Sequence, residues 1–223
     1  MKKSLLIVCL CFLGVVAYAQ KETKVSIETE YGKIVMLLYN NTPQHRDNMI
    51  KLAQSHFYDS TLFHRVIPNF VIQGGDPQSK HAQPGTMLGN GEIGYRIPAE
   101  INTEDCHIRG AVGMARDGNP KKESSGCQFY IVTGKPATDG ELDNVERSRG
   151  AKYTAAQRGI YKTQGGTPHL DGGYTVFGQV IEGMDVVDKI SAQTCDQNNR
   201  PTKDIAMIKV RLVKKKKKFL GIF

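Results

Sequence analysis

Several short segments of the sequence hold residue types that can do chemistry, and one of them is rich in glycine. Residues 89–94 read Gly-Asn-Gly-Glu-Ile-Gly, which matches the G-x-G-x-x-G pattern that binds a pyrophosphate where a buried strand turns into a helix. Pro84 and Gly85 precede this segment, where a nucleotide fold would have a buried strand, and Pro98 follows before a helix could form. We therefore expect a glycine-rich loop and no nucleotide site.

Nucleophiles and metal ligands lack the spacing that catalysis requires. Residues 124–127, Ser-Ser-Gly-Cys, are not the G-x-S-x-G turn that exposes a hydrolase serine. Cys106 and His107 are adjacent, and neighbours in a strand point to opposite faces, so they would not meet as nucleophile and base. The chain has no C-x-x-C pair, and its 6 histidines show no H-E-x-x-H spacing. We predict no metal site and no cofactor.

One long motif carries more information than any of these segments. Residues 63–76 read Phe-His-Arg-Val-Ile-Pro-Asn-Phe-Val-Ile-Gln-Gly-Gly-Asp. Further along come Gly113-Met114-Ala115, then Ser125-Gly126-Cys127-Gln128-Phe129-Tyr130-Ile131, then Leu170-Asp171-Gly172 and Val176-Phe177-Gly178. In content and order these motifs resemble the cyclophilin peptidyl-prolyl isomerases, over about residues 24 to 213 apart from one polar insertion. The resemblance implies the barrel fold of that family and catalysis of rotation about X-Pro peptide bonds.

Without that resemblance the same residues would have ordinary interpretations: Arg65 as a strand-surface charge, Phe70 and Tyr130 as core aromatics, and Gln73 as a solvated side chain. The resemblance implies that Arg65, Phe70 and Gln73 are catalytic. It also implies a set of substrate-binding residues, with the main chain near Ala115 pairing with the residue before proline: His64, Val71, Met114, Ala115, Arg116, Gln128, Phe129, Tyr130, His169, Leu170 and Tyr174.

Two positions depart from the commonest animal members of the family. His169 stands where those members have tryptophan, and Tyr174 stands where they have histidine. Both substitutions keep a ring, so isomerisation should persist. The indole nitrogen is an important donor to cyclosporin in the family, so weakened cyclosporin binding is expected.

The reaction makes no covalent intermediate. Rotation about the bond before proline faces a barrier of about 18–20 kcal/mol, and the twisted amide has a basic prolyl nitrogen that the planar amide lacks. A donor aimed at that nitrogen binds the transition state selectively. Arg65 suits this role because guanidinium is planar, always charged and weakly hydrated. An apolar slot would hold the proline ring and supply the rest of the acceleration.

The pattern of the chain predicts the elements that position these residues. Strands are expected at 24–30, 32–39, 61–66, 70–73, 111–115, 128–132, 175–180 and 205–213. Helices are expected at about 43–54, where Thr42 and Pro43 form a start signal, and at 184–190. Together they predict a mainly β fold, a closed antiparallel eight-stranded barrel capped by two helices. Residues 135–167 are polar and read as an inserted surface excursion, with a short helix around 151–158.

The two ends of the chain differ from its body. Lys2 and Lys3 precede the apolar run 5–16 and the small-x-small residues Ala17-Tyr18-Ala19, a pattern that predicts a signal peptide at 1–19 and an exported, periplasmic or secreted protein. The run is shorter than the roughly 20 residues that span a membrane. Cleavage would leave Cys106, Cys127 and Cys195, which allow at most one disulfide and are expected to be buried or idle thiols.

Net charge also separates the ends from the body. The total is +8, but Lys2, Lys3 and the run Lys214–Lys218 supply seven of the 30 basic side chains, so residues 20–213, the predicted isomerase domain, carry only +1. We therefore expect no nucleic-acid partner. The basic tail 214–223 is expected to be solvated, with contact between Lys214–Lys218 and an anionic membrane surface as the alternative.

The sequence as a whole favours a monomeric exported prolyl isomerase that acts on proline-containing polypeptides. The alternative is a proline-peptide binding module or a holdase chaperone on the same fold, in which turnover is incidental.

Overall fold

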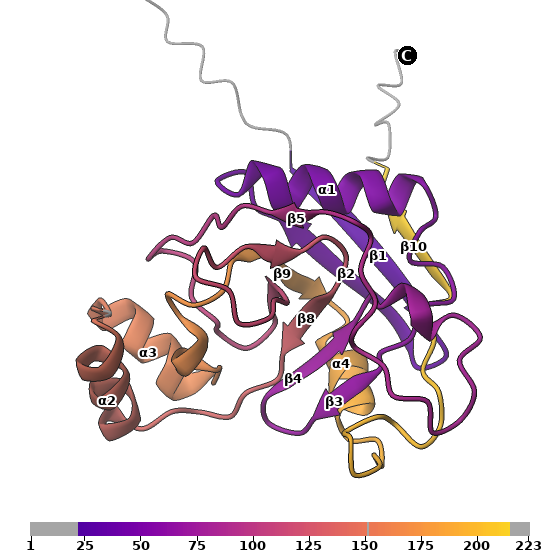
Figure 1. Ribbon diagram of the computed structural model, residues 1–223. Coiled ribbons are helices and arrows are strands. Elements are labelled where there is room, and N and C mark those ends of the chain that lie inside the picture. The colour runs from indigo at the N-terminus through magenta and orange to yellow at the C-terminus, as the bar shows by residue number, and fades with distance from the viewer. Residues whose placement is uncertain (1–21, 151, 215–223) are drawn as a thin grey trace, which may run out of the picture.

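The structure is a computed structural model that describes residues 22–150 and 152–214, and its main feature is one curled antiparallel sheet (Figure 1). Eight strands form this sheet. Their spatial order is β10 (Lys209–Leu212), β1 (Thr23–Thr29), β2 (Gly32–Leu38), β9 (Val176–Glu182), β6 (Ala111–Met114), β8 (Phe129–Val132), β4 (Val71–Gly74) and β3 (Arg65–Ile67). A separate pair joins β5 (Arg96–Ile97) to β7 (Ser124–Ser125).

The predicted closed barrel is wrong, because the sheet curls without closing. Its edge strands β3 and β10 are only 3 and 4 residues long and do not pair with each other. The chain segments preceding these two strands meet instead, through the isolated bridge between Leu62 and Ala206 and a bond from the Phe63 N–H to the Ile205 carbonyl oxygen (2.9 Å). The predicted strand at 61–66 is correspondingly shorter, and its first four residues are irregular.

Two helices lie where the sequence predicted them, α1 (Pro43–Gln54) and α4 (Met184–Ser191), and Figure 1 shows them near opposite ends of the curled sheet. α1 begins at Pro43, but the Thr42 hydroxyl makes no capping bond. The Glu100 carboxylate accepts the N–H groups of Gln44 (3.1 Å) and His45 (3.0 Å) instead. An acidic group from a distant loop therefore caps this helix, and it also opposes the positive end of the helix dipole.

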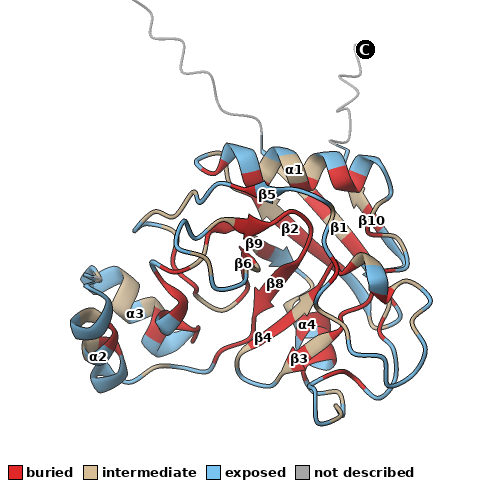
Figure 2. Cartoon of the chain, in the orientation of Figure 1, coloured by how far each residue is buried: buried red, intermediate tan, exposed pale blue. Residues whose placement is uncertain are grey.

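The interior of the sheet holds the main core (Figure 2). In β1 the apolar Val25 and Ile27 are buried, while Ser26 between them is less buried and Glu28 after them is exposed. This two-residue alternation is what a sheet with one covered face requires. Phe63, Phe129 and Phe177, each 0% exposed, fill the centre.

The insertion at 135–167 is more ordered than the sequence predicted. It contains α2 (Asp139–Arg149) and α3 (Ala155–Thr163), so the short helix expected at 151–158 lies later, and α2 was missed. Both helices start with a capping box, Thr138 with Glu141 and Thr154 with Gln157. These pairs are visible in the sequence as T-x-x-E and T-x-x-Q. The described residues of this segment include no strand, and the segment leads into a short 3-10 turn, η2 (Pro168–Leu170).

Within residues 22–150 and 152–214, no helix is both long and apolar enough to cross a membrane. The same residues contain no group of three or more histidine, cysteine, aspartate or glutamate side chains that could hold a metal ion. The predicted signal peptide at 1–19 and the lysines 215–218 lie outside the described residues.

Candidate functional site

The register of three neighbouring strands brings the central polar residues of the predicted site into one row. Arg65 in β3 pairs with Gln73 in β4, and Gln73 pairs with Tyr130 in β8. Directly paired residues lie on the same face of a sheet. Val66, next to Arg65, is 0% exposed and belongs to the core, so Arg65 points to the opposite, outer face. Phe63 can still be buried, because the chain before Arg65 is not a regular strand.

A chain of hydrogen bonds orients this row. Arg65 Nη1 donates to Gln73 Oε1 (3.2 Å), and Gln73 Nε2 donates to Gln128 Oε1 (3.2 Å). Gln128 Nε2 then donates to the carbonyl oxygens of Gly89 (3.0 Å) and Gly91 (2.9 Å). The guanidinium therefore has a fixed direction, and among the described residues no carboxylate lies within ion-pair distance of it. Its remaining N–H groups can serve a ligand.

An apolar cluster lies beside the guanidinium. Val71, Tyr130 and Leu170 are buried members, with exposed fractions of 2%, 4% and 9%. Phe70 packs against them at the margin, with its ring centre 6.0 Å from Arg65 Cζ. The Phe70 ring also stacks on His169 at 5.4 Å and 17°. The Arg65 guanidinium therefore lies at the edge of an apolar surface, next to the stacked rings of Phe70 and His169.

The ring of Tyr130 is tightly enclosed on the sheet side. Gly113 is its partner across the β6–β8 ladder, and a Cβ atom on Gly113 would lie only 2.3–2.5 Å from the Tyr130 phenol. Any other residue at 113 would push the ring out of its place. The glycine of the Gly113-Met114-Ala115 motif is therefore required by this close approach.

The strand end at Ala115 and Arg116 lies on the other side of this cluster. The Ala115 N–H donates to the Gln128 carbonyl oxygen (2.8 Å), and the Ala115 carbonyl oxygen accepts the Ser125 N–H (2.8 Å). The Arg116 side chain is also held, because its Nε donates to the Gly173 carbonyl oxygen (2.7 Å) and its guanidinium lies 4.6 Å from the Tyr174 ring centre. Arg116 forms no backbone–backbone bond within the described part of the chain, so its main chain can pair with an extended ligand.

Three of the residues predicted to bind substrate are placed differently from the rest. Met114 and Phe129 are 0% exposed and belong to the main core, so their side chains support the strands and do not line the outer surface. His64 is 3% exposed, and neither of its ring nitrogens has a partner in the described part of the structure. Burial lowers the pKa of His64 to about 4, so the ring is neutral at pH 7.

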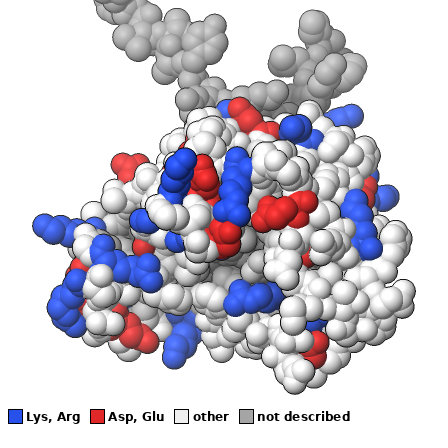
Figure 3. Space-filling model, in the orientation of Figure 1, with Lys and Arg blue, Asp and Glu red and all other residues white. Residues whose placement is uncertain are grey.

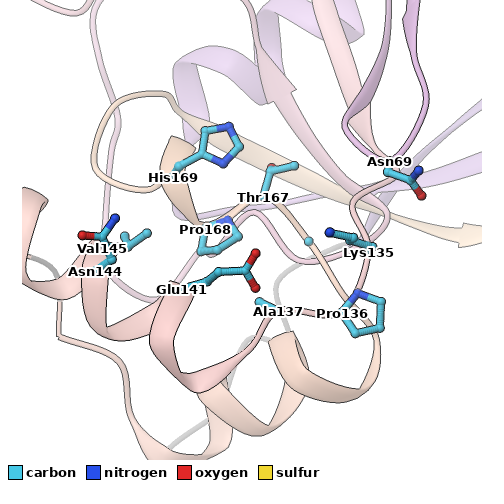
Figure 4. A pocket seen from close by; sticks show the side chains of 11 residues that line it. Asn69, Lys135, Pro136, Ala137, Glu141, Asn144, Val145, Thr167, Pro168 and His169 are labelled. Carbon is cyan, nitrogen blue, oxygen red and sulfur yellow. The ribbon is translucent and has the colours of Figure 1, made fainter.

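Two cavities adjoin the row and the cluster. One of about 270 Å³ lies between His64, Arg65, Gln73 and the loop 86–90. Another, of about 290 Å³, is lined by Asn69, by α2 and by residues 166–169 (Figure 4). His169 borders the second cavity and also stacks on Phe70, so the insertion reaches the edge of the site. The sequence did not predict this contact.

The glycine-rich loop and the three cysteines of the isomerase domain have these surroundings in the structure. The loop 89–94 wraps an internal carboxylate, since Asp76 Oδ2 accepts the N–H groups of Gly89 (2.5 Å) and Gly91 (3.3 Å), and no helix follows it. Cys106, Cys127 and Cys195 are free thiols, and burial raises the pKa of both Cys106 and Cys127 to about 12. Such thiols are protonated at neutral pH and are not nucleophiles.

Sequence analysis missed a group of buried residues behind the apolar cluster. His107 and Asp171 are hydrogen-bonded to each other. His107 also bonds Tyr130, and Asp171 also bonds Tyr153 and Tyr161 of the insertion. A signal was present, because a buried tyrosine hydroxyl needs a partner and Tyr130 lies within an apolar strand.

Comparison with known proteins decides what this arrangement belongs to. Residues 24–212 match the sequence model of the family described as cyclophilin type peptidyl-prolyl cis-trans isomerase/CLD. The chain belongs to the cyclophilin-type peptidyl-prolyl cis-trans isomerases. The family predicted from the motifs is thereby confirmed.

Similar curated proteins come from bacteria and fungi. A peptidyl-prolyl cis-trans isomerase of Acinetobacter baylyi is 35% identical over 176 residues, which cover 78% of this chain and 75% of that protein. A peptidyl-prolyl cis-trans isomerase-like 1 protein of Neurospora crassa is 32% identical, with 86% and 95% covered. The cyclophilin chain spans only 37% and 29% of two longer relatives, from Streptococcus pyogenes and Rhizopus delemar.

Solved structures agree on the fold. A cyclophilin-type peptidyl-prolyl cis-trans isomerase of Cryptosporidium parvum superposes with a TM-score of 0.65 at 24% identity, covering 88% of this chain and 100% of that one. A second structure of that protein, described as being in the presence of the dipeptide Ala-Pro, gives a TM-score of 0.63 at 24% identity, with 86% and 99% covered.

Proposed function

We propose that this cyclophilin accelerates rotation about X-Pro bonds in polypeptides with Arg65 as the donor to the twisted amide. One observation carries this proposal. Arg65 Nη1 donates to Gln73 Oε1 (3.2 Å), and this bond orients the guanidinium at the edge of the apolar cluster. The cluster would hold the proline ring while the acyl side turns. The Ala-Pro dipeptide present with the Cryptosporidium protein supports a proline-containing ligand.

The rate required shows that Arg65 does not act alone. Shortening an uncatalysed process of ~100 s to ~1 ms takes about five decades, or roughly 7 kcal/mol. One hydrogen bond to a charged group contributes about 1.5–3 kcal/mol. The remainder is assigned to the apolar surface of Phe70, Val71, Tyr130 and Leu170, which removes water from the amide, since the planar amide is more polar than the twisted one.

A stopped-flow assay on a short peptide with one X-Pro bond tests this function. Arg65→Ala should lose most of kcat/KM while retaining some peptide binding. Arg147→Ala is the matched control, because Arg147 is an exposed arginine of α2 and should leave turnover unchanged. Unchanged turnover in Arg65→Ala would refute the mechanism. Peptide binding without turnover in the unaltered protein would favour the holdase alternative.

We further propose that the clients are exported proteins. The support is the predicted signal peptide at 1–19, with Lys2 and Lys3 before an apolar run. The nearly neutral body agrees with a protein-folding role, and the face in Figure 3 mixes basic and acidic side chains instead of gathering one sign. Mass spectrometry of the protein from its native cells should find an N-terminus at residue 20. An intact N-terminus in the cytoplasmic fraction would contradict export.

A further inference from the structure

A buried polar network lies directly behind the apolar cluster of the proposed site. His107 Nδ1 bonds Asp171 Oδ1 at 2.6 Å, and His107 Nε2 bonds the Tyr130 hydroxyl at 2.8 Å. The other carboxylate oxygen, Asp171 Oδ2, accepts the hydroxyls of Tyr153 (2.7 Å) and Tyr161 (2.5 Å). Five side chains from four parts of the chain therefore meet at one carboxylate and one imidazole.

Burial makes this network costly to break. His107, Tyr161 and Asp171 have exposed fractions of 1%, 0% and 8%. Burial alone would raise the pKa of Asp171, but the hydrogen bonds from His107, Tyr161 and Tyr153 outweigh it, so the pKa is lowered and the group stays a carboxylate. A buried charge that loses a donor is strongly destabilised.

The bonding pattern also sets the direction of the hydrogen bond between His107 and Asp171. A carboxylate only accepts, so His107 Nδ1 carries the hydrogen that faces Asp171. The other ring nitrogen, Nε2, shares a hydrogen bond with the Tyr130 hydroxyl (2.8 Å). Burial raises the pKa of Tyr130 well above its ordinary value, so the phenol stays un-ionised. The Tyr130 hydroxyl is held at one point by a histidine that Asp171 orients.

The network adjoins the proposed proline-facing surface at two places. One is Tyr130, whose ring also stacks with His107 (6.0 Å, 17°) and meets Tyr174 edge-on (6.1 Å, 84°). The other is Leu170, the residue immediately before Asp171 in the chain. A tilt of the Tyr130 ring would break its bond to His107, and a shift of Asp171 would move Leu170.

The insertion fastens this network from behind. Tyr153 lies between α2 and α3, and Tyr161 lies in α3. α2 packs against both α3 and η2. Figure 1 shows the two helices together beside the sheet, away from α1 and α4. The hydroxyls of Tyr153 and Tyr161 are the contact of this segment with Asp171.

We propose that His107 and Asp171 are positioning residues for the proline-facing surface, and that the insertion acts through Tyr153 and Tyr161 to hold them. The chain of action runs from the hydroxyls of Tyr153 and Tyr161 to Asp171, then to His107, and then to the ring of Tyr130. This proposal rests on the proposed function, because it assigns Tyr130 and Leu170 to the surface that receives proline.

A double-mutant cycle on Tyr161 and Tyr130 tests it, using the full chain. Tyr161→Phe removes one hydroxyl outside the apolar cluster and keeps the ring. Its kcat/KM on an X-Pro peptide should fall about three- to tenfold. In the Tyr130→Phe background, where the final bond is already absent, Tyr161→Phe should have almost no further effect. Tyr153→Phe should behave in the same way. Its side chain is half-buried, so removing its hydroxyl should disturb folding less.

Tyr58→Phe is the matched control. It also removes a buried hydroxyl, one that donates to the Cys127 carbonyl oxygen (3.0 Å), but Tyr58 belongs to the main core. It should lower the melting temperature without changing kcat/KM. A general loss of stability would instead make the activity of all the variants follow their melting temperatures.

The outcomes separate the network from the function. Additive effects of Tyr161→Phe and Tyr130→Phe would overturn the network, as would unchanged activity in both Tyr161→Phe and Tyr153→Phe. An active enzyme that loses activity in Arg65→Ala but not in the tyrosine variants keeps the proposed function and refutes the positioning role. An enzyme whose turnover is unchanged in Arg65→Ala refutes the proposed role of Arg65 as the donor, and an unaltered protein that binds the peptide without isomerising it refutes the function itself.

Discussion

Replacing Arg65 by lysine keeps the charge and removes the fork. In the structure one Nη atom of Arg65 bonds Gln73 (3.2 Å), which leaves the other N–H groups with a direction that the protein has set. The Cζ atom also lies 6.0 Å from the Phe70 ring centre. A lysine has a single nitrogen on a flexible stem, so an ammonium that bonds Gln73 has no fixed direction toward the prolyl nitrogen.

The size of the effect follows from the one bond that is lost in the transition state. A charge-assisted hydrogen bond of about 1.5–3 kcal/mol corresponds to a fall in kcat/KM of roughly 10- to 150-fold. KM should change little, because the apolar surface that binds the proline ring is intact. The assay is stopped-flow isomerisation of a tetrapeptide with one X-Pro bond, and Arg147→Lys is the control. A kcat/KM for Arg65→Lys within twofold of the unaltered enzyme would refute the directional role of the guanidinium.

Three further outcomes are expected. The pKa of His64 is about 4 in the folded protein and about 6.5 in the unfolded chain, so the unfolded chain binds more protons between these two pH values. The contribution of His64 to the free energy of unfolding should therefore fall by about 3 kcal/mol from pH 7 to pH 4. Urea unfolding at pH 7 and at pH 4 should show a smaller loss of stability in His64→Gln. The guanidinium of Arg65 does not titrate near neutrality and the mechanism uses no general acid or base, so kcat/KM should be nearly flat between about pH 6 and 8. A bell-shaped profile would contradict this. Cyclosporin should inhibit weakly, and His169→Trp should increase inhibition; an unchanged inhibition constant would count against position 169.

The order of strands and helices could largely be predicted, since it follows from local patterns. Alternation in β1 and the Thr42-Pro43 start of α1 are both visible in the chain. Local patterns could not predict whether the sheet closes into a barrel or stays open, as it does here. Closure depends on how residues 60–66 meet residues 199–207, and those segments join through single backbone bonds and one isolated bridge. Such contacts leave no periodic pattern in a sequence.

The row of Arg65, Gln73 and Tyr130 depends on register. Each residue lies in a different strand, and a slip of one residue would send a side chain to the other face. Alternation within β8 does carry information that sequence analysis did not use. Phe129 lies between Gln128 and Tyr130, so a regular strand must turn it toward the core, where the structure places it. Proximity in a motif was therefore a weaker guide to the site than position within the strand.

The polar composition of the insertion did not predict that it packs against the rest of the protein. Its charged residues form ion pairs at or near the surface, such as Arg158 with Asp143 (2.7 Å) and Lys162 with Asp139 (2.7 Å). Pairs of this kind contribute little to stability, and they gave the segment the look of a solvated excursion. The residues that tie it to the protein are two tyrosines whose hydroxyls reach a carboxylate 10 or 18 positions away. A tyrosine in a polar segment is ambiguous until its partner is known, because the same side chain can be solvated or buried. The buried Asp171 resolves the ambiguity, since a carboxylate in that environment needs several donors, and α3 supplies one of them.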